Sequence, residues 1–226
     1  MTKQCKALGI RKEHQTLSVT TDFQGATEMC SLFVLPEFRG NYNGPLIARS
    51  RYLFMAEHPQ RFSKTVIAEM RGVSDEEGHA PFWNAIGRHF YGVEFPEADY
   101  LTGMGEKQFI ADLMPEFRIY SSMLPEEAQK VIGQVHEQTK PAQVLIEKEG
   151  FQYAGYVDIF DAGPTMVCEF NQIKTIHKSR KSTVKIVSNL DQSDLESFPE
   201  EVFISNTHRD FRACQAMIIP QEGHVI

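Results

Sequence analysis

The chain has 226 residues, of which 42% are hydrophobic and 23% are charged. These proportions are ordinary for a globular protein with a core of its own, and they exclude disordered, collagen-like and disulfide-scaffold chains. The 30 acidic side chains outnumber the 23 basic ones, and the net charge of −7 argues against nucleic acid as a partner. The apolar runs are too short to span a bilayer and the first residues lack the apolar stretch of a signal peptide, so we expect a cytoplasmic protein with no membrane partner.

Strands and helices alternate in the first part of the chain. Residues 15–20 and 27–35 are rich in β-branched and apolar side chains, which is typical of strands, and residues 65–70 form another such run. A helix is expected from about residue 45 to residue 57, because apolar residues recur at helical spacing and Pro45 is tolerated in a first turn. The same spacing predicts helices over residues 81–90, 106–114, 125–132 and 141–149.

After Gly150 the hydrophobic period shifts towards two. Thr139 is placed to cap the preceding helix, and Gly150 to follow its end. Strands are predicted over residues 156–160, 165–170, 184–187, 202–204 and 213–219. This order of elements predicts an α/β or α+β fold with a small β-rich C-terminal part. Because the stretch 188–199 is polar and acidic, we divide the chain into residues 1–187 and 188–226.

Neither cysteines nor histidines predict a metal site. The four cysteines lie far apart with no C-x-x-C pair, which indicates thiols in a reducing compartment. The acidic residues around His79 are flanked by Gly72 and Gly78, so this stretch is interpreted as a solvated turn. We therefore expect no metal.

Three segments carry candidate chemistry. The loop 36–44 leads from a strand into a helix, where N–H groups and the helix dipole favour a phosphate. The alternative is an ordinary strand-to-helix turn. His136 lies in a loop between two helices, where it is either a general acid–base or a hydrogen-bonding surface residue. Asp158 and Asp161 precede a Gly-Pro turn and either pair with a cation or cap the turn.

A further pair, Glu69 and Arg71, shares one face of its predicted strand. These two side chains either point into a site or form an ion pair.

The chain resembles the acyl-CoA N-acyltransferases of the GNAT superfamily, and more specifically the bacterial arginine N-succinyltransferases. The superfamily resemblance rests on the strand around Leu32 with its following loop and helix. The closer resemblance rests on strings that occur in the family's order, at residues 68–73, 81–83, 109–115, 131–136, 147–151 and 158–165. It is dense from about Glu13 to Arg180.

The resemblance implies a GNAT-like mixed sheet with flanking helices and a transferase of arginine catabolism. Its members transfer succinyl from succinyl-CoA to the α-amino group of L-arginine, with succinyl-CoA as co-substrate and no permanently bound cofactor. Ornithine is an alternative amine substrate. An alternative from another class is a non-catalytic remnant or subunit that binds CoA or a partner chain without performing transfer alone.

Site residues follow from the same resemblance. His136 matches the family's proton donor, and Leu32 matches its succinyl-CoA contact. The strand and loop are expected to hold the acyl-CoA through Leu32, Phe33, Arg39, Gly40, Asn43 and Gly44. The expected partners of arginine's guanidinium are Asp158, Asp161 and Glu69, and Arg71 is assigned to the succinyl carboxylate. Tyr42 stands where the superfamily loop usually has glycine, and Pro45 removes one N–H group, so the phosphate cradle is expected to be stiffer.

Length is the largest departure from the family. Its members carry further residues before the position of Met1, which hold the first strands of the fold, and they continue past Ile226. The resemblance therefore implies an N-terminally incomplete fold whose unpaired sheet edge favours a homo- or hetero-oligomer with similar subunits.

Overall fold

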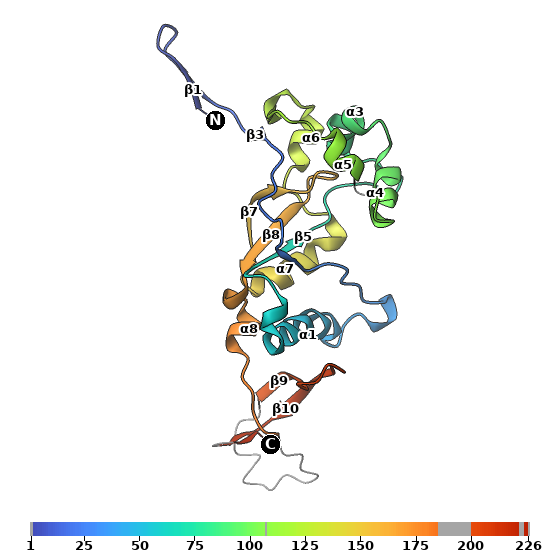
Figure 1. Cartoon of the computed structure of the whole chain (residues 1–226), viewed down its shortest axis with the longest axis vertical. Helices are drawn as coiled ribbons and strands as arrows, with labels where there is room; N and C mark the ends of the chain where they lie inside the picture. The colour runs from blue at the N-terminus through green and yellow to red at the C-terminus, as the bar shows by residue number, and fades with distance from the viewer. Residues whose placement is uncertain (1, 107, 185–199, 222–223, 226) are drawn as a thin grey trace.

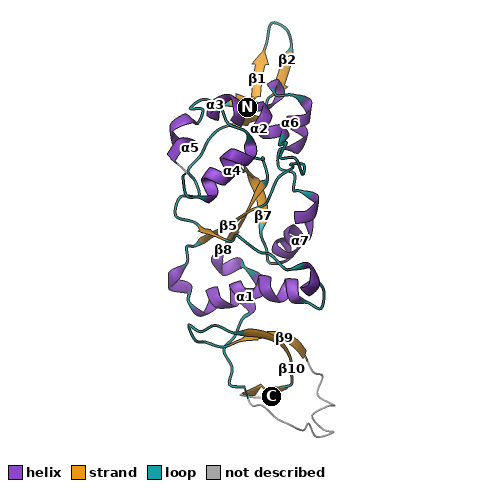
Figure 2. Ribbon diagram, turned by 90° about the vertical axis from the view of Figure 1, so that its right-hand side faces the viewer, coloured by secondary structure: helices purple, strands orange, loops and turns teal. Residues whose placement is uncertain are grey.

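The computed structural model describes residues 2–106, 108–184, 200–221 and 224–225. It is elongated, with a group of short helices near one end, a sheet in the middle, and a β-hairpin at the other end (Figures 1 and 2). Within the described residues, no helix is both long and apolar enough to cross a membrane.

A mixed four-stranded sheet forms the centre of the chain. Its spatial order is β4 (Thr27–Glu28), β5 (Thr65–Glu69), β8 (Pro164–Glu169) and β7 (Gln152–Val157). β4 runs parallel to β5, whereas the other neighbouring strands are antiparallel. The expected mixed sheet with flanking helices is thus confirmed.

Strand β5 divides the sheet into a core face and a cavity face. Successive side chains of a strand point to opposite faces. Val66, Ala68 and Met70 accordingly belong to the main hydrophobic core, whereas Glu69 and Arg71 point to the other face and are exposed. The core face is covered by α1 (Asn43–Glu57), α7 (Lys140–Lys148) and α8 (Lys174–Lys178) (Figure 1).

Helix α1 forms because its apolar positions suit one buried stripe. Ala48, Tyr52 and Met55 are spaced four and three residues apart and are all buried. The helix begins two residues before Pro45, which keeps this proline in the first turn where no hydrogen bond is lost. The predicted helix is therefore confirmed with a slightly earlier start.

The helical end of the molecule surrounds Trp83. It consists of α2 (Pro81–Ala85), α3 (Gly87–Tyr91), α4 (Phe95–Gly103), α5 (Gln108–Leu113) and α6 (Glu126–Val131). The Trp83 ring is fully buried, stacks on Tyr91 and Phe160, and donates its indole N–H to the Val93 carbonyl.

The single helix expected over residues 81–90 is wrong. The structure has two helices there, because Ile86 leaves the helical conformation at φ −128° and ψ −67°. Gly87 then lies so close to Trp83 that a Cβ atom on it would be 2.2 Å from the indole ring. Tertiary packing on the tryptophan thus overrides the local helical pattern.

Smaller elements extend from this body. The hairpin of β1 (Thr2–Cys5) and β2 (Ile10–Glu13) is exposed throughout, and β3 (Thr16–Leu17) pairs with β6 (Ile119–Tyr120). At the other end β9 (Glu200–Ser205) pairs with β10 (Ala213–Ile218), and β11 (Pro220–Gln221) with β12 (His224–Val225). The remaining helical turns are η1 (Pro36–Phe38), η2 (Pro59–Arg61), η3 (Ser121–Met123), η4 (Glu137–Thr139) and η5 (Phe170–Gln172).

Several predicted boundaries need correction. The strand expected over residues 27–35 ends at Glu28, the strand expected over 15–20 is only Thr16–Leu17, and the strand expected over 156–160 ends at Val157. Thr139 occupies the N-cap position of α7 but its side chain makes no capping bond, whereas Gly150 has the expected positive φ of 106°. The predicted strand 184–187 lies largely outside the described residues, and the domain boundary 188–199 lies wholly outside them. The division into residues 1–187 and 188–226 therefore stays a prediction.

Candidate active site

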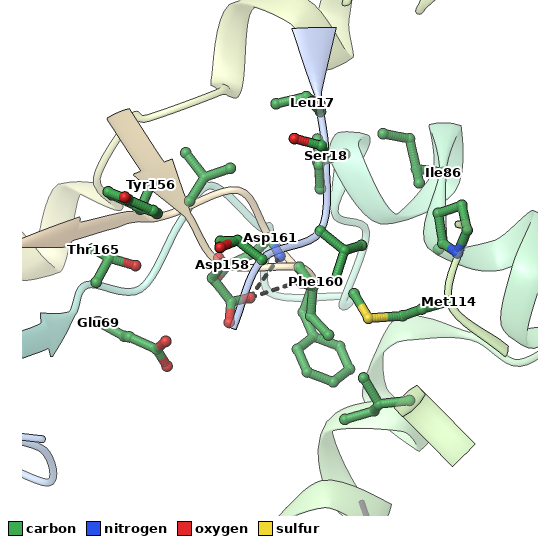
Figure 3. Close-up of a pocket in the computed structure, with 18 of the residues that line it drawn as sticks. Leu17, Ser18, Glu69, Ile86, Met114, Tyr156, Asp158, Phe160, Asp161 and Thr165 are labelled. Atoms are coloured by element: carbon green, nitrogen blue, oxygen red, sulfur yellow. Dashed lines mark hydrogen bonds between the residues drawn. The ribbon is translucent and has the colours of Figure 1, made fainter. Parts of the chain in front are cut away.

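A large cavity lies on the exposed face of β5. Its volume is about 1240 Å³, and it is lined by the end of β5, by β7 and the turn after it, by the helical end, and by the N-terminal segment 16–24. Figure 3 shows side chains from these separate elements converging on it. All four residues that the sequence analysis assigned to substrate line this cavity, namely Glu69, Arg71, Asp158 and Asp161.

The lining of the cavity is acidic and aromatic. Its acidic members are Asp22, Glu69, Asp99, Asp158 and Asp161, against Arg71 as its basic member. Its aromatic members are Phe23, Phe82, Phe90, Tyr91, Phe95, Phe117, Tyr156 and Phe160. Carboxylates and aromatic faces both attract cations, so the lining is suited to a positively charged organic group.

Asp161 joins the end of β5 to the turn before β8. Its buried carboxylate accepts hydrogen bonds from the backbone N–H groups of Gly72, at 2.7 Å, and Gly163, at 2.8 Å. Both residues must be glycine, because a Cβ on Gly163 would lie 1.9 Å from the Met70 carbonyl oxygen and one on Gly72 would lie 2.4 Å from that of Asp161. Each oxygen of Asp161 thus already has a backbone partner, which leaves it less available to a ligand.

Asp158 stands beside it in a different environment. One oxygen, Oδ1, accepts from the N–H groups of Phe160 at 2.7 Å and Asp161 at 3.2 Å. The pKa of Asp158 is raised to about 7, first by burial and then by the negative charges of Asp161 and Glu69, while the two N–H bonds oppose the rise. This carboxyl group is therefore fixed in place and titrates close to neutral pH.

His136 is held next to the same end of β5 by main-chain bonds. Its N–H donates to the Arg71 carbonyl at 2.9 Å, and the N–H of Gly133 donates to the Ala162 carbonyl at 2.8 Å. His136 precedes η4, and its Nδ1 accepts the N–H of Gln138 at 3.2 Å. Because Nδ1 accepts this N–H, the neutral ring carries its proton on Nε2. A proton on Nε2 is one requirement for a role of this nitrogen as proton donor. Among the described residues the cavity lining contains Arg71 but not His136 itself.

The predicted acyl-CoA segment begins where β4 leaves β5. The last link between them is the bond from the Met29 N–H to the Ile67 carbonyl, at 2.8 Å. Ser31 then adopts φ +57°, which turns the chain away from a regular strand. Leu32 is half-buried and Phe33 is 66% exposed.

The loop before α1 is shaped by side-chain bonds to its own backbone. Arg39 donates from Nε to the Val34 carbonyl at 3.1 Å, and its guanidinium lies 6.0 Å from the centre of the Phe33 ring. Asn43 donates from Nδ2 to the Phe38 carbonyl at 2.9 Å. These contacts tie the loop to the start of α1.

The backbone of this loop is open to a ligand at its glycines. Gly40, Asn41 and Tyr42 have successive positive φ values of 98°, 46° and 62°. A Cβ on Gly40 or Gly44 would meet no atom within 4 Å, so both positions face open space. A phosphate can approach the N-terminus of the fifteen-residue helix α1 closely here.

The predicted site residues therefore form two groups with His136 beside one of them. The substrate residues share the cavity, and His136 is bonded to Arg71 at its edge. The residues predicted to bind acyl-CoA lie in the segment after β4, where the chain leaves β5, and in the loop before α1. Sequence reasoning missed Asp22, whose carboxylate accepts the Tyr156 hydroxyl at 2.8 Å across 134 residues, because no local pattern marks so distant a contact.

The acidic turn at His79 has the structure expected of a solvated turn. Asp75, Glu77 and His79 are exposed, and their potential ligand atoms lie within 4.8 Å of one another. Asp75 accepts the backbone N–H groups of Glu77 and His79, so its carboxylate closes the turn.

Comparison with known proteins gives a consistent result. The family model described as "Arginine N-succinyltransferase beta subunit" matches residues 1–175. An arginine N-succinyltransferase of Yersinia pestis is 46% identical over 210 residues, covering 92% of this chain and 60% of the relative, and one of Salmonella typhi is 43% identical, covering 98% and 63%. A solved structure described as arginine/ornithine succinyltransferase subunit AI from Pseudomonas aeruginosa superposes with a TM-score of 0.81 at 31% identity, covering 99% of this chain and 63% of that one. The chain thus spans about three fifths of the length of these relatives.

Proposed function

The chain belongs to the arginine N-succinyltransferase beta-subunit family, and on this premise we propose that it transfers the succinyl group of succinyl-CoA to the α-amino group of L-arginine. The observation that carries the proposal is the placement of His136. The backbone N–H of His136 is bonded to Arg71 at the rim of an acidic cavity, and its imidazole carries a proton on Nε2. Succinyl-CoA acts as co-substrate, and the reaction needs no resident cofactor.

The proposed reaction is a direct acyl transfer. The neutral amine attacks the thioester carbonyl, a new C–N bond forms, and the C–S bond breaks. The departing CoA thiolate takes a proton from His136 Nε2. The proton that the amine loses on forming the C–N bond passes through water to the imidazole and restores it, so that one proton moves from nitrogen to sulfur in the whole reaction. An N–H donor from the chain beyond β4, near Leu32 or Phe33, stabilises the tetrahedral oxyanion.

The acyl-CoA is proposed to lie along the segment from Leu32 to the start of α1. Phe33 is exposed and Gly40 and Gly44 face open space, which suits a ligand lying against this backbone. Arg39 and Asn43 shape the loop that receives the phosphates.

The test is His136→Gln, followed by thiol release from succinyl-CoA in the presence of arginine. Loss of the proton donor is expected to lower kcat by a factor on the order of 10² to 10⁴. The matched control is His89→Gln, which replaces an exposed histidine on α3 and should leave kcat unchanged. Undiminished turnover of the His136 variant would refute the catalytic assignment.

A second proposal is a subunit that binds CoA or a partner chain but performs no transfer alone. It is supported by the matching family model, which describes a beta subunit. The edge strand β4 pairs only with β5 over the described residues, and this edge suits an assembly with similar subunits. Calorimetry with CoA beside the activity assay separates the two proposals, since CoA binding without transfer favours the second.

A further inference from the structure

The residues of the cavity differ in how far their polar atoms are already occupied. Asp161 accepts a backbone N–H at each oxygen, and Asp22 accepts the hydroxyl of Tyr156. Arg71 donates to the Ser74 hydroxyl at 3.0 Å. The hydrogen bonds of Asp158 to other described residues are instead made by Oδ1 alone, so Oδ2 remains for a ligand.

Asp158 is also held in a fixed position. Its Oδ1 is held by the N–H of Phe160, whose ring stacks on the fully buried Trp83 at a centroid distance of 5.3 Å. Figure 3 shows Asp158 and Glu69 directed toward one part of the cavity, with the Phe160 ring beside them. Two carboxylates and an aromatic face at one point match the planar, delocalised charge of a guanidinium.

We propose that Asp158, assisted by Glu69 and the Phe160 ring, binds the guanidinium of the amino-acid substrate and selects a cationic side chain over a neutral one of equal shape. This inference rests on the proposed function and assigns one task within it. Asp161 is excluded from that task, because it holds the backbone that positions Asp158. Arg71, two residues beyond Glu69 in the same cavity lining, is left for an anionic group.

The charges around Asp158 agree with such a role. Its acidic neighbours are Asp161 in the same turn and Glu69 on β5, while Arg71 is the basic residue in the lining. Burial raises the pKa of Asp158, and the repulsion between these carboxylates in the absence of a ligand adds to that rise. A bound guanidinium would relieve that repulsion, which is a gain that a neutral ligand does not supply.

The experiment compares L-arginine with L-citrulline, its neutral ureido analogue, by calorimetry on the 226-residue chain. The wild type is expected to prefer arginine, and Asp158→Asn is expected to weaken arginine binding by about tenfold to a hundredfold while citrulline changes by less than about threefold. The substituted asparagine keeps a side-chain oxygen for the two backbone N–H groups, and thermal melts verify folding. Glu69→Gln is a second variant on a separate, exposed residue, with a smaller loss expected in the same direction.

Glu97→Gln is the matched control, because it removes one exposed carboxylate from α4 at a position that does not line the cavity. Its preference for arginine should stay that of the wild type. If the wild type binds arginine but Asp158→Asn keeps the full preference, this inference is wrong and the proposed function stands. If the wild type binds CoA but not arginine, the proposed function itself fails.

Discussion

Replacing Asp158 by asparagine should stabilise the protein at alkaline pH. The pKa of this carboxyl group is raised from 3.8 to about 7 in the folded chain. Between these two values the folded protein holds a proton that the unfolded chain has lost, so the free energy of unfolding falls as the pH rises through this window. At about 1.4 kcal/mol per pKa unit the penalty reaches about 4 kcal/mol at most above pH 7.

Asparagine removes this penalty without removing the acceptor. Its side-chain oxygen can still accept the N–H groups of Phe160 and Asp161. Urea unfolding followed by circular dichroism, at intervals from pH 4 to pH 8.5, should show the variant gaining stability over the wild type as the pH rises. The exposed control Asp99→Asn should change the unfolding free energy by less than about 0.5 kcal/mol. A gain for Asp158→Asn that is the same at every pH would refute the reasoning.

Two further changes test what holds the site's scaffold together. Glu149→Ala leaves Arg49 without its buried partner, 3.0 Å away, and should cost about 3 kcal/mol of unfolding free energy. Glu147→Ala, at an exposed position two residues earlier in the last turn of α7, should cost less than about 1 kcal/mol. Gly163→Ala forces a methyl group against the backbone of β5 and should cost more than about 3 kcal/mol, whereas Gly103→Ala, which meets no atom within 4 Å, should be neutral or slightly stabilising. Denaturant midpoints measure each pair; equal costs within the first pair would show that burial of the ion pair is unimportant, and equal costs within the second would show that the backbone contact yields easily.

The sequence predicted best what depends on local periodicity. Helix α7 was expected over residues 141–149 and spans Lys140–Lys148, since its apolar spacing and the following Gly150 are local signals. The strand expected through Leu35 stops at Glu28, because a strand needs a partner and β5 pairs with β4 only at its start. The β-propensity of these residues does not show whether a neighbouring strand is present to pair with them.

The candidate site was only partly visible for the same reason. His136, Asp158 and the loop before α1 could be named from the resemblance, which carries long-range information that a single chain's pattern lacks. The sequence could not predict that Asp161 holds the backbone while Asp158 keeps an oxygen for a ligand. It depends on the N–H of Gly72, which lies 89 residues from Asp161 and meets it only in the folded chain.

The anchoring of the His136 loop has a consequence for how the site can change over evolutionary time. The hydrogen bonds from His136 to Arg71 and from Gly133 to Ala162 join main-chain atoms at both ends, so no side chain takes part in either of them. The position of the His136 loop is therefore fixed by backbone hydrogen bonds, whereas the side chains of the lining determine what the cavity can bind. Substrate preference can drift by substitution in the cavity while the imidazole stays where it is.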